Sequence, residues 1–490
     1  MKRKTIAMPL FTVEELREVI STKVLAGECP GWLKLPIRRI HLDSRSIRRG
    51  DLFVAIVGDR FDGHDFVGAA IEGGAMGAIV QDTFHAAALV NRRGGNERLP
   101  LLLGVRDPLL AYQQLASHHR SRFDIPVVAV TGSNGKTTTK EMVASVLAQR
   151  WKVLKTEGNL NNRIGVPQTL LRLDGRHEAA VIEMGVDRVG QTTRLCEIAR
   201  PTVGLITNIG PDHLEFFGGM EGSMRAKAEL LAWLPEDGAA VLNADDPYFE
   251  HLASRSRCRV VSFGFTHKAD VRATQIRVEN RGTFFRLWLP GKVRPVAVRL
   301  RVQGEHNVAN ALAAAAVGNL LGVPPMSIVE GLSCFRPVAM RSQVFMSCGI
   351  TIINDCYNAN PASMKAAIRL LAQRGQGRKT IALLGDMLEL GSAAASMHEE
   401  VGVFVAEQGI SQLVVCGSWG RHVAAGAERG GLDRSRIVLV PDAARAGEVV
   451  KALARSGDVV LVKGSRGMKL EQAVEILQRQ ETGRAVKTAS

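Results

Sequence analysis

Apolar residues follow two patterns along this chain, and each pattern predicts a different element. Continuous apolar runs over residues 127–130, 179–182, 203–206 and 239–242 predict buried strands, because strands covered on both faces of a parallel sheet do not alternate. Between these runs, apolar residues recur at helical spacing, as in residues 141–149. The alternation of strand and helix predicts a parallel sheet with helices on both faces.

The order of these patterns divides the chain into three predicted domains of an α/β fold. Residues 1–122 mix short strands and helices and predict a small α/β N-terminal domain. Residues 123–336 hold the long apolar runs and predict a central parallel-sheet domain. Residues 337–490 repeat strand and helix without the G-x-G-x-x-G fingerprint, which predicts a C-terminal Rossmann-like domain. The length of 490 residues agrees with about three domains.

Shorter signals place elements within these domains. We expect turns at residues 43–45 and 62–64, a helix near 109–120, a strand-rich stretch at 258–302 and an alanine-rich helix at 306–322. Pro324-Pro325 and Arg336-Pro337 are candidate linker signals. The third domain is expected to hold strands at residues 350–355, 380–386, 412–417, 436–440 and 458–464.

A glycine loop with a following Lys-Thr pair predicts a phosphate site at the start of the central domain. The loop reads VTGSNGKTTTKEM at 130–142, after a buried run and before a predicted helix. Backbone N–H groups and the positive end of the helix dipole would meet a phosphate there. The spacing is a variant, because only two residues separate Gly132 from Gly135 where the common motif has four. The sequence therefore predicts a P-loop ATPase domain that binds ATP or GTP.

The loop residues carry different expected roles. Lys136 can reach a β- or γ-phosphate and the Thr137 hydroxyl can bind Mg²⁺. The remaining nucleotide-binding candidates of the loop are Gly132, Ser133, Asn134, Gly135 and Thr138.

Two further strands end in polar residues that could bind a metal. Glu183 closes the run at 179–182, and His213 follows the run at 203–206. The carboxyl ends of parallel strands meet at one edge of a sheet, where such sheets bind ligands. A surface carboxylate and a loop histidine are the alternatives for these residues taken alone. Beside a nucleotide, both residues are candidate metal ligands, and the imidazole suggests a second metal.

Charge and composition narrow the classes of protein. The formal charge of +15 suggests nucleic acid, but the basic residues are not clustered. In residues 296–302, arginines alternate with apolar residues, which predicts the solvated face of a half-buried strand. Such a surface would also attract a small anionic substrate.

No apolar run reaches the roughly 20 residues that cross a membrane, so no membrane insertion is expected. Residues 1–20 do not predict a signal peptide, because Pro9, Glu14 and Glu15 interrupt the apolar part. Seven cysteines without a C-x-x-C pair predict neither a disulfide framework nor a zinc site, and we expect a cytoplasmic protein.

Motifs along the whole chain resemble those of the Mur ligases. In chain order they are TGSNGKTT, GNLNNRIGVP, IEMG, TNIGPDHLEFFG, MRAKAEL, GEHNVANALAA and NDCYNANPASM. Within the family, the segments DSR, DGHDF, YNANP, GDMLELG and VKGSRGM are similar to the branch that joins D-alanyl-D-alanine to UDP-N-acetylmuramoyl-tripeptide. The resemblance implies a uridine-nucleotide-binding first domain, a central ATPase domain and a mobile third domain.

The resemblance also implies the chemistry. A substrate carboxylate attacks the γ-phosphate of ATP, and an amine then displaces phosphate from the acyl phosphate, giving the pentapeptide precursor of peptidoglycan, ADP and phosphate. Such a ligase would serve cell-wall synthesis, and so cell shape and division. Two anions must meet in this reaction, which requires cations and oriented N–H donors. Lys136 and two Mg²⁺ ions would supply them.

Other roles are implied by the resemblance alone. Lys227 would be carbamylated and bind the second metal, so that Thr137, Glu183, His213 and Lys227 form the metal set. An ordinary exposed helix lysine is the alternative for Lys227. Lys136, Lys227, His213 and Arg341 would be the catalytic residues, with Arg341 meeting the γ-phosphate when the third domain closes.

Nucleotide and substrate contacts complete the expected site. Asn307 and Asn310 lie one helical turn apart, and taken alone they are ordinary polar helix residues. The resemblance implies that their amides meet adenine and that Asp355 holds the ribose. By the same resemblance, Ser44, Arg45 and His64 would contact uridine diphosphate, although Arg45 could equally be a surface residue. Asn161 and Asn162 in GNLNNRIGVP are further expected substrate contacts. The expected dipeptide contacts are Tyr357, Asn358 and Asn360.

Three positions depart from the family pattern, namely Asn354, Cys356 and Gln191, where aspartate, serine and glutamate are common. An amino-acid-adding Mur ligase or a folate polyglutamate ligase is an alternative of the same class. A P-loop NTPase that acts on nucleic acid is an alternative of a different class, suggested by the charge. We expect a monomer whose partners are the two substrates and not nucleic acid.

Overall fold

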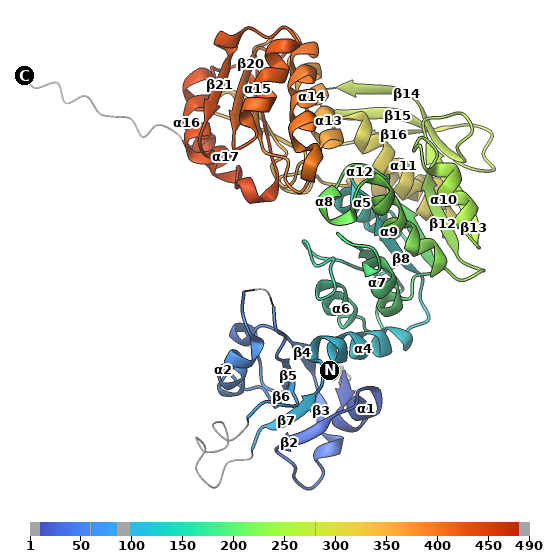
Figure 1. Cartoon of the computed structure of the whole chain (residues 1–490). Coiled ribbons are helices and arrows are strands. Elements are labelled where there is room, and N and C mark those ends of the chain that lie inside the picture. The colour runs from blue at the N-terminus through green and yellow to red at the C-terminus, as the bar shows by residue number, and fades with distance from the viewer. Residues whose placement is uncertain (1–9, 59, 86–98, 280, 480–490) are drawn as a thin grey trace, which may run out of the picture. The chain divides into compact units, whose positions relative to one another are not determined.

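The computed structural model describes residues 10–58, 60–85, 99–279 and 281–479 (Figure 1). The chain forms two compact units. Unit 1 comprises residues 1–129, 152–184 and 193–202, and unit 2 comprises residues 130–151, 185–192 and 203–490. Residues 1–9, on which the absence of a signal peptide was partly argued, lie outside the described residues. Within the described ranges, no helix is long and apolar enough to cross a membrane.

A five-stranded sheet with the order β2-β7-β6-β5-β4 forms the centre of unit 1. Its strands are β2 (Lys23–Ala26), β4 (Arg39–His41), β5 (Asp51–Val54), β6 (Gly77–Gln81) and β7 (Leu101–Val105). Strands β4 to β7 are parallel, and β2 pairs antiparallel at the edge. A smaller pair joins β1 (Phe11–Thr12) to β3 (Pro36–Ile37). The predicted small α/β domain is present.

Successive residues of these strands point to opposite faces, so the sheet has two cores. Leu52 and Val54 of β5 pack with residues of α1 (Val13–Val19) and α4 (Pro108–Ser121). Phe53, which lies between them, packs with residues of α2 (Val67–Glu72) on the other face. Figure 1 shows α2 on one side of these strands and α1 with α4 on the other. Asp107 begins α4 by accepting hydrogen bonds from two backbone N–H groups of its first turn.

The rest of unit 1 holds two parallel strands and a short helix. These are β9 (Val153–Lys155), β10 (Ala179–Glu183) and α6 (Gly165–Leu170). Strand β8 (Val127–Thr131) carries the chain from unit 1 into unit 2, and α7 (Gln191–Ala199) also spans the division.

Unit 2 contains strands in the order β16-β15-β14-β13-β12-β11. Strands β11 (Val203–Ile206), β12 (Ala239–Asn243), β13 (Arg259–Gly264) and β14 (Val271–Glu279) are parallel. Strands β15 (Gly282–Trp288) and β16 (Val296–Leu300) extend them antiparallel. In β16, Arg299 is exposed while Val298 and Leu300 are buried, which confirms the predicted half-buried strand.

Helices of unit 2 follow the predicted spacing. They are α5 (Lys136–Leu147), α8 (Leu214–Phe217), α9 (Met220–Ala232), α10 (Phe249–Arg255), α11 (Glu305–Leu320) and α12 (Pro325–Cys334). The prediction of a linker at Pro324-Pro325 is wrong, because Pro325 opens α12. Proline suits the first helical position, where its missing N–H would have no partner in the helix.

The C-terminal part of unit 2 is a six-stranded sheet with the order β17-β18-β22-β19-β20-β21. Its strands are β17 (Gln343–Ser347), β18 (Ile350–Asn354), β19 (Thr380–Gly385), β20 (Gln412–Cys416), β21 (Ile437–Val440) and β22 (Val459–Lys463). The last five match the predicted Rossmann-like strands and are parallel. The antiparallel edge strand β17 was not predicted.

Helices cover both faces of this C-terminal sheet. They are α13 (Pro361–Arg374), α14 (Ala394–Glu407), α15 (Gly420–Arg429), α16 (Ala443–Leu453) and α17 (Glu471–Gln478). Ile353 and Leu461 pack against α13 and α14, while Ile352 and Val460 face α16 and α17. The carboxyl ends of the parallel strands therefore meet at one edge, where the loops 355–360, 386–391 and 464–468 begin.

Candidate active site

Two glycines of the phosphate loop cannot be replaced without distortion. Gly132 has a φ of 135°, and a Cβ there would overlap the Thr207 hydroxyl. Gly135 has a φ of 79° and ends the loop before α5, and a Cβ there would overlap Oδ1 of Asn310. Both positions require positive φ and close backbone approach, which only glycine provides without strain. The loop has the form that the sequence predicts.

The chain after β11 supports the loop from one side. The Asn134 N–H donates to Oδ1 of Asn208 at 3.0 Å, and the Asn134 carbonyl accepts from the Thr207 hydroxyl at 2.6 Å. Ser133 Oγ accepts from the Gly210 N–H at 2.8 Å and lies 2.7 Å from an Asp212 carboxylate oxygen. These contacts hold the loop in shape, since its glycines would otherwise be mobile.

The predicted phosphate contacts begin α5. The Lys136 ammonium lies 2.5 Å from the Gly132 carbonyl and 3.3 Å from the Ser133 carbonyl, so it curls over its own loop. Thr137 is buried and Thr138 is half-buried in the first turn. This turn places the Lys136 charge and the positive end of the helix dipole at one point.

Lys227 is buried, so the alternative of an ordinary exposed lysine is wrong. Its side chain is 1% exposed on α9. The ammonium donates to Asp212 Oδ1 at 3.0 Å and to the Ser223 hydroxyl at 2.7 Å, and it lies 4.6 Å from the centre of the Phe217 ring. The same Asp212 oxygen accepts from Ser133 of the phosphate loop. Asp212 therefore joins the loop to Lys227.

The environment changes the acidity of this pair. Burial lowers the pKa of Lys227 to about 8, although Asp212 opposes the shift. Burial alone would raise the pKa of Asp212, but Lys227 and Lys136 together hold it below its usual value. The ordinary lysine pKa is about 10.4, so Lys227 has a much larger neutral fraction near pH 8 than an exposed lysine. A neutral amine is the form that reacts with CO₂.

His213 lies between the phosphate loop and the C-terminal sheet. It has a φ of 49° and directly precedes α8. Its Nδ1 contacts Oε2 of Glu389, which the sequence analysis did not assign a role. Phe217 lies edge-on to its ring, with the ring centres 6.2 Å apart.

In unit 1, Glu183 ends β10 and is 1% exposed. Its N–H donates to the Thr156 hydroxyl at 3.0 Å, and its Oε1 accepts from Asn161 at 2.8 Å. Asn162 instead shapes the turn before α6, because its Oδ1 accepts from the N–H groups of Ile164 and Gly165. Of the two predicted asparagines, Asn161 is therefore the one beside a predicted metal ligand.

The two asparagines of α11 contact the protein through their amides. Asn307 donates to the Gln303 carbonyl at 2.8 Å, and Asn310 donates to Asn307 at 3.3 Å. Asn310 also accepts from the Thr139 hydroxyl at 3.1 Å. Asn310 thus lies beneath the first turn of α5, and α11 is tied to the phosphate loop.

In the C-terminal part, Arg341 pairs with another predicted residue, Tyr357, whereas Asp355 pairs with two residues that were given no role. The Arg341 guanidinium stacks over Tyr357, 4.0 Å from the ring centre. Asp355 accepts from the Ser342 N–H at 2.7 Å and from Lys463 at 2.6 Å. Lys463, at the end of β22, is 2% exposed.

Asn360 and Asn358 lie in the loop before α13. Asn360 caps this helix by accepting from the Ser363 N–H at 2.9 Å, and it donates to Asn134 of the phosphate loop at 2.8 Å. The Asn358 carbonyl accepts from Lys463 at 2.9 Å. The loop that was assigned to the dipeptide therefore contacts the phosphate loop.

The predicted uridine contacts of unit 1 lie at the carboxyl ends of β4 and β5. His64 donates from Nδ1 to Asp62 at 2.6 Å and accepts at Nε2 from the Gln81 N–H at 2.9 Å, which fixes its tautomer. Ser44 and Arg45 follow β4, and the exposed Arg45 pairs with Asp43. This pairing lowers the pKa of Asp43 to about 2, mainly through the Arg45 hydrogen bonds.

The three departures from the family pattern have local partners. The Cys356 thiol lies 3.0 Å from Oδ1 of Asn354, and burial raises its pKa to about 12, so it is not a nucleophile at neutral pH. Gln191 exchanges two hydrogen bonds with Asp187 at the start of α7. Within the described part of the chain, the cysteines form no disulfide.

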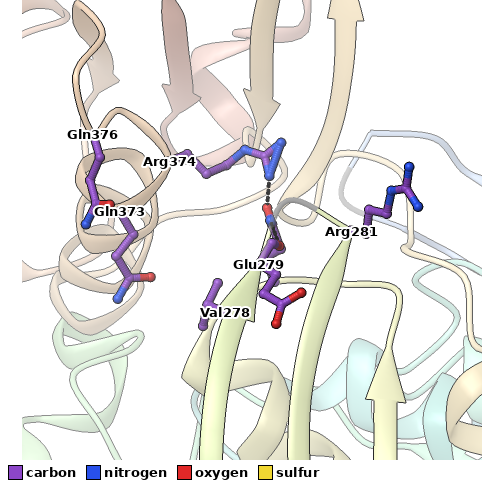
Figure 2. A pocket seen from close by; sticks show the side chains of 7 residues that line it. Val278, Glu279, Arg281, Gln373, Arg374 and Gln376 are labelled. Atoms are coloured by element: carbon purple, nitrogen blue, oxygen red, sulfur yellow. Dashed lines mark hydrogen bonds between the residues drawn. The ribbon is translucent and has the colours of Figure 1, made fainter.

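A pocket of about 480 Å³ lies between the end of α13 and the residues Val278, Glu279 and Arg281 near the end of β14. Figure 2 shows Arg374 reaching across it, and the dashed line marks its hydrogen bond to Gln303. Gln303 is also the residue whose carbonyl accepts from Asn307. Arg374 therefore connects the C-terminal part of unit 2 to the predicted adenine helix.

The residues present fit a divalent cation in unit 2. Oδ2 of Asp212 is buried and has no hydrogen-bond partner within the described residues. Hard cations such as Mg²⁺ prefer carboxylate and hydroxyl oxygens, and the Thr137 hydroxyl lies in the same unit. The described residues contain no group of three or more His, Cys, Asp or Glu side chains that alone could hold a metal. The nucleotide phosphates would have to complete such a site.

Comparisons with known proteins agree with this geometry. Three family profiles match: "Mur ligase family, catalytic domain" at residues 36–119, "Mur ligase middle domain" at 130–318 and "Mur ligase, glutamate ligase domain" at 340–466. A protein of Bacillus subtilis named UDP-N-acetylmuramoyl-tripeptide--D-alanyl-D-alanine ligase is 36% identical over 95% of this chain and 98% of its own.

Two solved structures are also similar. Crystal structure I of MurF from Acinetobacter baumannii has a TM-score of 0.85 and 32% identity, covering 97% of this chain and 100% of its own. MurF ligase from Thermotoga maritima in complex with ADP has a TM-score of 0.77 and 29% identity, covering 90% and 97%. The fold and site define an ATP-using ligase architecture, and the chain belongs to the Mur ligase family.

Family membership confirms the resemblance, the three-part α/β fold and the class of enzyme that the sequence predicted. The sequence analysis quoted the segments that hold Asp212, Glu389 and Lys463 but assigned these residues no role. Asp212 directly precedes His213 in the segment that follows β11, and its place next to a predicted metal ligand was the signal that could have found it.

Proposed function

We propose that this chain joins D-alanyl-D-alanine to UDP-N-acetylmuramoyl-tripeptide with ATP, and so completes the pentapeptide precursor of peptidoglycan. One observation carries the proposal: the glycine-dependent phosphate loop is tied through Asp212 to the buried Lys227. A site that must activate a carboxylate needs such a cationic, preorganised face. The names of similar proteins, which cover nearly all of the chain, support the particular substrates.

The reaction proceeds in two balanced steps. A carboxylate oxygen of the tripeptide attacks the γ-phosphorus of ATP, the bond to the bridging oxygen breaks, and ADP leaves with that electron pair. The amine of the dipeptide then attacks the acyl carbon, phosphate leaves, and the amine loses a proton. In this scheme Lys136 and Arg341 stabilise charge on the transferring phosphoryl group.

The remaining roles follow the site residues. The loop residues Gly132 to Thr138 cradle the phosphates, Asn307 and Asn310 belong to the adenine region, and Asp355 holds the ribose. Ser44, Arg45 and His64 receive the uridine diphosphate. Asn161, Asn162, Tyr357, Asn358 and Asn360 contact the peptide substrates, with Asn360 also capping α13.

Two Mg²⁺ ions are proposed, held by Thr137, Glu183, His213 and a carbamylated Lys227. When bound, Mg²⁺ would neutralise charge on the phosphates. The lowered pKa of Lys227 supports the carbamate, because CO₂ reacts only with the neutral amine. We propose three domains, at residues 1–122, 123–336 and 337–490. We also propose that the enzyme acts as a monomer in the cytoplasm.

Phosphate release tests this function against its alternatives. We expect release that requires both UDP-N-acetylmuramoyl-tripeptide and D-alanyl-D-alanine. Release with a single amino acid instead of the dipeptide would indicate the amino-acid-adding or folate-type alternative. Release stimulated by DNA or RNA and indifferent to both peptides would indicate the nucleic-acid NTPase.

A loop variant links the assay to the site. Lys136→Ala removes a point charge that no neighbouring side chain of the loop supplies, so we expect turnover to be abolished in a folded protein. Circular dichroism checks the fold. A folded Lys136→Ala variant that ligates at the wild-type rate would remove the phosphate-loop assignment.

A further inference from the structure

The loop at residues 386–391, called here the GDMLEL loop, is held firmly on the C-terminal sheet. The Met387 N–H donates to Nε2 of His398 at 2.9 Å, and the Leu388 N–H donates to the Ser465 hydroxyl at 2.9 Å. Nδ1 of His398 in turn donates to the Ala394 carbonyl at 2.6 Å. With its main chain fixed at two successive residues, the loop presents Glu389 in a defined position.

The short helix α8 docks on this loop. The Glu215 N–H donates to the Glu389 carbonyl at 3.2 Å. Leu214 is buried in the same core cluster as Met387 and Leu390. The segment that follows His213 is therefore packed into the C-terminal core, although it belongs to the chain after β11.

A side-chain contact between His213 and Glu389 also joins the segment before α8 to the GDMLEL loop. Oε2 of Glu389 contacts Nδ1 of His213. Because an ionised carboxylate can only accept, Nδ1 must carry the proton, and in the neutral ring Nε2 keeps its lone pair for another ligand. Both residues have positive φ values, 49° and 64°, which non-glycine residues adopt rarely and mostly where surrounding structure enforces them.

We propose that Glu389 is a positioning residue that fixes the tautomer and ring orientation of His213, so that Nε2 is ready to bind a metal. This inference rests on the proposed function, in which His213 is a metal ligand. Ligating histidines commonly donate their other ring N–H to a carboxylate, which orients the ring. The pair is partly exposed, with side chains 30% and 44% accessible, and the ring that binds a metal is neutral, so orientation is the main effect of the pair.

The arrangement also reaches Lys227. Phe217 ends α8, lies edge-on to the His213 ring, and places its own ring 4.6 Å from the Lys227 ammonium. Docking of α8 on the GDMLEL loop therefore sets the positions of two proposed metal ligands together. The C-terminal part of the chain thereby contributes to the metal site without supplying a ligand.

Three variants of the full chain test the role. Glu389→Ala removes the acceptor, and Glu389→Gln keeps an amide oxygen at the same place. Glu400→Gln is the matched control, because Glu400 is an exposed residue of α14 that pairs with Lys365. Imidazole ¹⁵N spectra of histidine-labelled protein report the tautomer without metal, nucleotide or turnover. The His213 signal is assigned by its loss in His213→Gln.

We expect the Nδ1–H tautomer at His213 in the wild type, in Glu389→Gln and in the control, and a mixture with Nε2–H in Glu389→Ala. In titrations with Mn²⁺ and a non-hydrolysable ATP analogue, Glu389→Ala should bind Mn²⁺ about 10- to 100-fold more weakly, while Glu389→Gln retains most of the affinity. The control should bind as the wild type does.

The outcomes separate this inference from the proposed function. An unchanged His213 tautomer in Glu389→Ala overturns the positioning role, whatever the metal does. Equal Mn²⁺ affinity in Glu389→Ala and the wild type also overturns it, provided that His213→Ala binds weakly. If His213→Ala itself binds Mn²⁺ like the wild type, the metal assignment of the proposed function fails, and the role of Glu389 in metal binding fails with it.

Discussion

Two buried lysines of unit 2 pair with aspartates in segments that follow parallel strands, yet their surroundings differ. Lys463 has three oxygen acceptors: the Asp355 carboxylate at 2.6 Å and the carbonyls of Asp355 and Asn358 at 3.4 and 2.9 Å. Lys227 has two, the Asp212 carboxylate and the Ser223 hydroxyl, and otherwise faces the Phe217 ring. Only Lys463 thus has an oxygen acceptor for each of its three N–H groups within the described residues.

The difference indicates different roles. The three hydrogen bonds of Lys463 fasten the loop 355–360 to β22. Burial favours the neutral amine of Lys227 and lowers its pKa to about 8, with a smaller contribution from the charge of Lys136. We interpret Lys463 as a structural cation and Lys227 as a lysine available for chemistry.

The largest test of this comparison is Lys227→Ala. We expect turnover to fall at least ~10³-fold, or about 4 kcal/mol in the activation barrier, because the variant loses the proposed metal ligand. Acetate at high concentration should restore part of the rate by occupying the vacant ligand position, whereas methylamine should not.

Lys463→Ala serves as the control, since acetate should not rescue it. Rescue of Lys227→Ala by the amine alone would mean that Lys227 acts as a cation, and the comparison would collapse. Removing Lys227 also leaves Asp212 buried without its counter-ion, so thermal unfolding of each variant must accompany the rate measurement.

Lys463→Met is the second test, and its main effect should fall on stability. The change leaves the Asp355 carboxylate without its buried counter-ion, so we expect the free energy of unfolding to fall by about 3 kcal/mol. Denaturant unfolding followed by far-UV circular dichroism measures it. The double variant Lys463→Met/Asp355→Asn should recover part of the loss. A Lys463→Met protein as stable as the wild type would show that this pair is not structural.

The phosphate loop shows what could be predicted from local sequence. The residues of this loop lie close together in the sequence, so their spacing alone predicted the shape of the loop. They are Gly132, Gly135, Lys136 and Thr137. The long apolar runs likewise predicted β11 and β12 because a strand buried on both faces needs no partner information. The edge strand β17 was missed, since its apolar run is only Val344 to Met346 and none of its residues is buried.

Contacts between distant segments could not be predicted in this way. His213 and Glu389 are 176 residues apart, and no local pattern reports that α8 docks on the GDMLEL loop. The burial of Lys227 also depends on Phe217 and Asp212, which neighbouring segments bring to it. Pro324-Pro325 has two structural meanings in sequence, linker or helix start, and only packing of α12 decided between them.

The third test concerns the effect of burial on protonation. The comparison attributes the lowered pKa of Lys227 to burial, and the buried His398 tests the same effect on another basic group. His398 is buried, stacks on Trp419 and has neutral hydrogen-bond partners, and burial lowers its pKa. The nearby Asp386 would raise this pKa, and His422 would lower it further.

Below about pH 6.5 the unfolded chain binds a proton at this position that the folded chain does not, so stability must fall as the pH falls. We expect up to about 1.4 kcal/mol of lost stability per pH unit, and His398→Gln should remove this dependence because an amide can donate to Ala394 and accept from Met387. Unfolding of both proteins at pH 7.5 and 5.5 measures it. Equal pH slopes in the two proteins would contradict the suppression.

The smallest expected effect is that of Ser223→Ala. The Ser223 hydroxyl accepts from Lys227 and lies 3.0 Å from Asp212 Oδ1, and in the carbamylated enzyme it would donate to the new carboxylate-like group. Losing one such hydrogen bond costs about 1 kcal/mol, so we expect an approximately fivefold higher bicarbonate concentration for half-maximal activity. Saturating bicarbonate should restore the wild-type rate.

Ser145→Ala on α5, whose hydroxyl donates to the Gly331 carbonyl, is the matched control and should show no bicarbonate dependence beyond that of the wild type. If Ser223→Ala loses activity that bicarbonate does not restore, the hydroxyl supports the fold around Asp212. Lys227 would then be a structural lysine like Lys463, which contradicts the comparison.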